Sequence, residues 1–117
     1  MFLQYYVTES TTGNRVNIEI NAATKTDLDA TRNGWQTVWN TDFILDPQKE
    51  KYAAKTEDGE IIALGAYRVR KGSVAVYIAY IESQPESNPT LVEHKKYSGI
   101  GKAMIAFGIQ LSIDANC

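Results

Sequence analysis

The sequence predicts a single α+β domain (residues 1–117), a mainly antiparallel sheet flanked by helices. Three observations predict this class. Alternating apolar residues near the N-terminus indicate a β-hairpin, a second hairpin and an apolar strand follow residue 51, and an amphipathic helix comes last. A length of 117 residues fits one domain, because domains commonly hold roughly 100–200 residues.

The first elements follow from local patterns. The segment Phe2–Val7 is rich in aromatic and β-branched residues, residues 11–14 form a turn cluster, and an alternating strand follows with Val16, Ile18 and Ile20. Thr24 or Thr26 can cap a short helix that runs through Thr31, since Asn33-Gly34 is a stop signal.

Residues 35–50 are ambiguous in the sequence. Trp35 and Trp39 have the i, i+4 spacing of a helix turn, and Asp46-Pro47 ends whatever element lies there. The two tryptophans could line a pocket for an acceptor substrate. Large aromatic residues more often belong to a core or an interface, so both interpretations stay open.

The second half reads as a meander of three antiparallel strands. Residues 52–55 and Ile61–Val69 flank an Asp-Gly turn and form a hairpin. Val74–Ile81 is apolar on both faces, which is typical of a central strand. Residues 83–96 then form a polar loop, and its length marks it as a functional candidate.

Residues 99–113 predict a helix with an apolar stripe of Ile100, Ala103, Met104, Phe107 and Leu111. Ile105 and Ile109 lie outside this stripe, so we expect the helix to be covered on more than one side.

The amino-acid composition and net charge limit which classes of function are plausible for this chain. Hydrophobic residues make up 44% of the chain and charged residues 22%, a globular composition. Twelve Lys and Arg against fourteen Asp and Glu give a net charge of -2, which disfavours nucleic-acid binding. Because we find no membrane-length apolar run, no signal peptide and one cysteine, Cys117, we expect a cytoplasmic protein with no membrane partner.

The segment from Lys96 to Ala103 carries the sharpest signal, a glycine-bearing turn that enters the last helix. Gly99 and Gly101 let a ligand approach the backbone, and free N–H groups at a helix start suit an anion. The same helix end carries the cations Lys95, Lys96 and Lys102. Each is unfavourable there by roughly 0.3–1 kcal/mol, a penalty that a bound phosphate would reverse.

Two familiar phosphate motifs fit poorly. The P-loop pattern would need a glycine at Lys96 and a hydroxyl at Ala103, so it is excluded. Gly99 and Gly101 match the first two glycines of the dinucleotide-binding motif G-x-G-x-x-G/A, but Met104 stands where the third glycine or alanine is required. A tight strand-to-helix loop without any ligand remains the simple alternative.

A third pattern, [RQ]-x-x-G-x-[GA], is matched by Lys96-Tyr97-Ser98-Gly99-Ile100-Gly101, with Lys in place of Arg or Gln. The chain thereby resembles the GNAT superfamily of N-acetyltransferases. The continuation through Met104 and the order of elements are also similar to that family. Tyr80–Pro85 and Phe107–Ser112 look like an uncharacterised bacterial branch of it.

The resemblance implies a GNAT-like fold that transfers the acetyl group of acetyl-CoA to a primary amine. It assigns the cofactor pyrophosphate to Lys96, Tyr97, Ser98, Gly99, Ile100, Gly101 and Lys102. Backbone N–H groups would polarise the thioester carbonyl. Glu82, at the end of the apolar strand, is the candidate general base, with a solvent-facing carboxylate as the plain alternative.

Other candidates are weaker. His94 lies in the loop without an orienting partner, Cys117 has no base nearby, and we find no spacing of ligands that predicts a metal site.

A complete GNAT domain continues beyond this helix, so the chain resembles the N-terminal portion of that fold, with its C-terminal part missing. The strand Val74–Ile81 would then lack its outer neighbour, and an apolar edge is a pairing hazard. We therefore expect a homo-oligomer, formed by strand exchange, or a partner segment. The second functional hypothesis is a non-catalytic domain that acts in self-assembly or partner binding.

Overall fold

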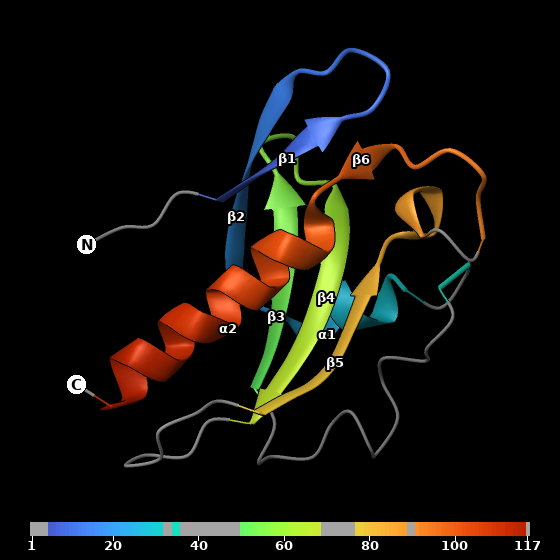
Figure 1. Cartoon of the computed structure of the whole chain (residues 1–117). Coiled ribbons are helices and arrows are strands. Elements are labelled where there is room, and N and C mark those ends of the chain that lie inside the picture. Colours follow the sequence, from blue (N-terminus) through green and yellow to red (C-terminus); the bar gives the residue numbers. More distant parts are fainter. Residues whose placement is uncertain (1–4, 32–33, 36–49, 69–76, 89–90, 117) are drawn as a thin grey trace.

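The computed structural model describes residues 5–31, 34–35, 50–68, 77–88 and 91–116. It confirms the α+β class, with a curled antiparallel sheet of the order β5-β4-β3-β2-β1-β6 and a long helix across one face (Figure 1). The elements are β1 (Tyr5–Glu9), β2 (Arg15–Ala22), α1 (Lys25–Asp29), β3 (Glu50–Thr56), β4 (Ile61–Arg68), β5 (Tyr77–Ser83), the 3₁₀ turn η1 (Pro85–Ser87), β6 (Tyr97–Ser98) and α2 (Ile100–Asn116).

Both predicted hairpins are confirmed. Strands β1 and β2 pair with Tyr5 opposite Ile18, and β3 and β4 pair with Ala53 opposite Leu64. Gly59 closes the second turn with a φ of +86°, and its N–H donates to the carbonyl of Thr56 at 2.9 Å. A positive φ is readily adopted by glycine, which is why the Asp-Gly pair located this turn correctly.

Helix α1 is held by a capping box. The Thr24 hydroxyl accepts from the Asp27 N–H at 3.1 Å, and the Asp27 carboxylate accepts from the Thr24 N–H at 2.9 Å. Of the two predicted caps, Thr24 is therefore the correct one. The helix ends at Asp29 rather than running through Thr31. An ion pair of 2.8 Å from Lys55 to Asp27 ties this helix to β3.

The main core lies between the sheet and α2. Tyr67 is fully buried there, and its hydroxyl donates to the backbone carbonyl of Met104 at 2.8 Å. Gly65 makes room for both residues, because a Cβ at this position would lie 2.7 Å from the Tyr67 ring and 2.9 Å from the Met104 methyl. A second cluster, which includes Leu28 and Leu64, packs on the α1 side of the sheet.

The expected central strand is an edge strand in the described part of the sheet. Strand β5 stands at the end of the strand order, and residues 74–76 lie outside the described residues. It is apolar on both faces because Ile78 and Ile81 pack towards α2 while Tyr80 packs on the α1 side. An apolar run of this kind indicates that both faces of the strand are covered. It does not indicate whether the strand lies at the centre or at the edge of the sheet.

Two further expectations were wrong. Tyr97 and Ser98, predicted as part of the glycine-bearing turn, form β6 and pair with Glu9 and Thr8 of β1. The outer side of α2 is exposed in the described structure, with exposed fractions of 50% for Ile105 and 58% for Ile109. Trp39, the Asp46-Pro47 pair and Cys117 lie outside the described residues.

Candidate functional site

A groove of about 760 Å³ lies between β1 and the start of α2. We call it the β1–α2 groove; it is lined by Tyr5, Tyr6, Val7, Thr8, Lys95, Ser98, Gly99, Gly101, Lys102, Ala103 and Ala106. Four of the residues predicted to bind the cofactor line it, namely Ser98, Gly99, Gly101 and Lys102. Its volume is in the range of small-molecule sites, roughly 300–1,000 Å³.

The start of α2 leaves backbone donors available to this groove. Gly99 precedes the helix with a φ of +90°, and its carbonyl accepts the first helical bond from the Ala103 N–H at 3.1 Å. Glycine has no side chain with which to cap the first-turn N–H groups, which lack intrahelical partners. A Cβ at Gly99 or at Gly101 would meet no atom within 4 Å, so the backbone is open on this side.

The other three predicted cofactor residues direct their side chains elsewhere. The ammonium of Lys96 lies 2.9 Å from the Glu60 carboxylate, and the hydroxyl of Tyr97 donates to the same carboxylate at 3.1 Å. Ile100 is 4% exposed and belongs to the main core. These three residues position the loop by anchoring it, and their side chains do not line the groove.

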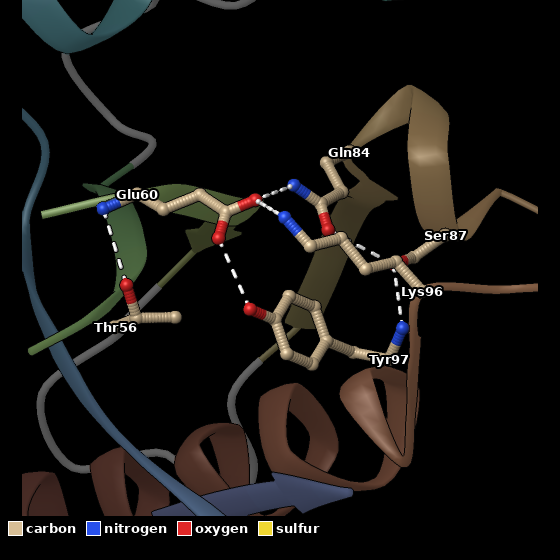
Figure 2. Close-up of polar contacts among 6 residues, drawn as sticks. All are labelled: Thr56, Glu60, Gln84, Ser87, Lys96 and Tyr97. Atoms are coloured by element: carbon tan, nitrogen blue, oxygen red, sulfur yellow. Dashed lines mark hydrogen bonds and ion pairs between the residues drawn. The ribbon is translucent and has the colours of Figure 1, made fainter. Parts of the chain in front are cut away.

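Glu60 is the centre of a polar network, which Figure 2 shows. Besides Lys96 and Tyr97, the Gln84 amide donates to its carboxylate at 2.9 Å. The carbonyl oxygen of that amide accepts from the Ser87 hydroxyl at 2.9 Å, and the Ser87 oxygen accepts from the Tyr97 N–H at 3.0 Å. The network thus joins the β3–β4 turn, η1 and β6, and it fixes the point from which the Gly99 turn begins.

The network changes the acidity of its ionisable members. Burial by itself would raise the pKa of Glu60, but the hydrogen bonds from Lys96, Gln84 and Tyr97 outweigh it and lower the pKa. The hydrogen bond to Glu60 raises the pKa of Lys96. Both groups are therefore held in their charged forms over a wider pH range than when they are free.

We expect the folded state to lose stability as the pH falls below about 4.3, the ordinary pKa of a glutamate. A carboxylate whose pKa is lowered by folding stabilises the protein above that value, and this contribution disappears as pH falls through the folded pKa. Thermal unfolding at pH 7 and at lower pH measures the loss. The Glu60→Gln variant, with no charge to titrate there, should lose less stability between the two; an equal loss in both proteins would contradict the assignment.

Glu82 lies away from the β1–α2 groove. It is 4% exposed and stands opposite Leu64 in the β4–β5 pairing. Directly opposed residues share a face of the sheet, and Leu64 packs on the α1 side while α2 covers the other side. The structure therefore does not bring the predicted base together with the predicted cofactor loop.

The remaining candidates occupy different places. His94 is exposed in the loop before β6. Trp35 is half-buried and lines a second cavity of about 400 Å³ together with Glu60 and Gln84. Within the described ranges, no group of three or more His, Cys, Asp or Glu residues could hold a metal ion. No helix in that part of the chain is long and apolar enough to cross a bilayer.

Comparison of the chain with protein-family models, with curated proteins and with solved structures gave no match.

Proposed function

We propose that the β1–α2 groove binds acetyl-CoA, with the pyrophosphate at the start of α2. The observation that carries this proposal is the coincidence of a groove of about 760 Å³ with the glycine turn. Lys95 and Lys102 line the same groove and supply positive charge for the phosphates. The uncapped N–H groups behind Gly99 provide hydrogen-bond donors for the same oxygens.

Acetyl transfer to a primary amine is the activity that we propose for the bound cofactor. In that reaction a bond forms between the amine nitrogen and the acetyl carbon, the bond from that carbon to sulfur breaks, and the amine proton ends on the thiol. Tyr5 lines the groove, and burial together with the nearby Asp114 raises its pKa. Its protonated phenol is thus a candidate hydrogen-bond donor to the departing sulfur.

In the part of the chain that the structure describes, the geometry does not supply a general base at the groove. Glu82 lies on the α1 side of the sheet, and no carboxylate lines the groove among the described residues. Cofactor binding is therefore the part of the activity that the geometry supports best, and amine transfer rests on the sequence resemblance.

A thermal shift tests the binding step directly. At 100 times its dissociation constant, acetyl-CoA should stabilise the folded state by about 2.7 kcal/mol. For a domain of this size, this corresponds to a rise in Tm of roughly 11 °C. Acetyl-pantetheine, which lacks the phosphates, is the matched control and should give a much smaller shift. Equal shifts from both ligands, or none from either, would rule out pyrophosphate binding at this groove.

The second candidate is a non-catalytic role in self-assembly. It is favoured by the position of β5 at the end of the described strand order, since an edge strand can pair with another chain. Light scattering that gives the mass of a monomer at all concentrations would remove this candidate and leave the binding proposal intact.

A further inference from the structure

The outer edge of β1 is only partly covered. The Glu9 N–H donates inward, to Asn14 at the β2 side, at 2.8 Å, whereas the Ser10 N–H donates outward, to the carbonyl of Lys96, at 3.0 Å. Backbone groups alternate direction along a strand, so those of Thr8 and Tyr6 also point outward. Strand β6 reaches Glu9 and Thr8 and no further. Among the described residues, no strand pairs with the outward N–H and C=O of Tyr6.

The β1–α2 groove occupies the place where the next residues of such a strand would lie. Tyr6 and Ser98 both line it, so it begins where β6 ends and continues along β1. Beside the rings of Tyr5 and Tyr6, its lining includes the small apolar side chains of Val7, Ala103 and Ala106. Small side chains leave room for an extended backbone to approach the strand edge.

Charge distinguishes the two ends of the groove. The end beside Ser98 and Gly99 carries Lys95 and Lys102, and both lysines are exposed. We find no ion-pair partner for either lysine within the described residues. An occupant that complements this end is therefore anionic there.

We propose that the β1–α2 groove binds an extended peptide by strand addition, pairing it with Tyr6 and holding its C-terminal carboxylate near Lys95 and Lys102. The peptide runs parallel to β1, because its carboxylate must lie beside Gly99, at the end of the groove next to Thr8. The stretch from Tyr5 to Val7, which β6 does not cover, is about 10 Å long at strand spacing, so about three peptide residues fill it. Every second side chain faces Val7, Ala103 and Ala106, which favours small apolar residues there.

This inference does not depend on acetyl-CoA binding. A peptide and the cofactor would occupy overlapping space, so each should displace the other if both bind. Loss of the cofactor proposal would leave the peptide proposal standing, and a peptide that fails to bind leaves the thermal shift with acetyl-CoA unaffected.

Selection from a library of random hexapeptides with free C-termini tests the proposal, followed by fluorescence anisotropy of the selected, labelled sequences. We expect saturable binding, weakened at least about fivefold when the C-terminus is amidated. The Ala106→Trp variant fills the groove and should lose binding. Ile105→Trp places the same ring on the exposed outer side of α2 and should retain it. Failure to select any peptide, or equal affinity of acid and amide, would overturn the proposal.

Amide hydrogen exchange provides a readout that needs no variant. Saturating peptide should slow exchange of the Tyr6 N–H at least roughly tenfold, because this group gains a hydrogen bond. The Val7 N–H points towards β2 already and should change little by comparison. A bound peptide that leaves Tyr6 exchange unchanged would show that it does not add as a strand.

Discussion

Replacement of Glu60 by alanine should lower the free energy of unfolding by about 2–4 kcal/mol, because it leaves buried donors without an acceptor. The residues Gln84 and Tyr97 are 3% and 6% exposed, and the side chains of both donate to the Glu60 carboxylate. The ion pair with Lys96 contributes little to this loss of stability, because 46% of the Lys96 side chain is exposed. For a domain of this size the expected fall in Tm is roughly 8–16 °C, which calorimetry or circular dichroism measures.

Glu57→Ala is the matched control for this variant. Glu57 lies in the same β3–β4 turn and is exposed, so its removal should change stability by less than about 0.5 kcal/mol. Glu60→Gln keeps an acceptor oxygen and should fall between the two. If Glu60→Ala is no less stable than Glu57→Ala, the network does not anchor β6.

Gly101→Glu should weaken acetyl-CoA binding strongly while it stabilises the free protein. A carboxylate in the first turn of α2 would face the cofactor phosphates, and like charges a few ångströms apart repel by on the order of 2–3 kcal/mol. This corresponds to a roughly 30- to 150-fold loss of affinity. In the free protein the same carboxylate replaces a helical glycine and complements the positive helix end, a gain of about 1 kcal/mol.

The opposite signs of the two effects separate this result from misfolding. A Cβ at position 101 meets no atom within 4 Å, so the fold accommodates the side chain. Gly101→Ala is the control, expected to gain helix stability and keep its affinity within a few-fold. Isothermal titration of both variants with acetyl-CoA gives the comparison. Unchanged affinity in Gly101→Glu would place the cofactor outside the groove.

The elements that could be predicted from the sequence are those set by neighbouring residues. The Asp58-Gly59 turn, the Thr24 cap and the alternation of Val16 and Ile18 act within a few positions, and each located its element. Strand β6 has no such pattern, because two residues are too short to show a period. Its pairing with β1 depends on contacts from across the chain, which no local rule contains.

The candidate site divides in the same way. The glycine turn was visible because Gly99 and Gly101 stand at a strand-to-helix junction, and both line the groove. A loop assignment does not predict which way the side chains of Lys96 and Tyr97 point. In the short strand β6 the side chains alternate, so Tyr97 is buried while its neighbours Lys96 and Ser98 are exposed. The role of Glu60 could not be predicted from the sequence, because a charged residue beside a hairpin turn usually faces solvent.

The late position of β6 in the chain has a kinetic consequence. From β1 to β5 each strand pairs with the next one along the chain, but the contact that joins Ser10 to Ser98 spans 88 residues. Bringing these two ends together costs conformational entropy of the chain between them. The strands from β1 to β5 must pair first to reduce this cost. We therefore expect the β1–α2 groove to be completed late in folding. A ligand bound there should then slow unfolding and leave the folding rate almost unchanged, because a site formed late does not contribute to the transition state.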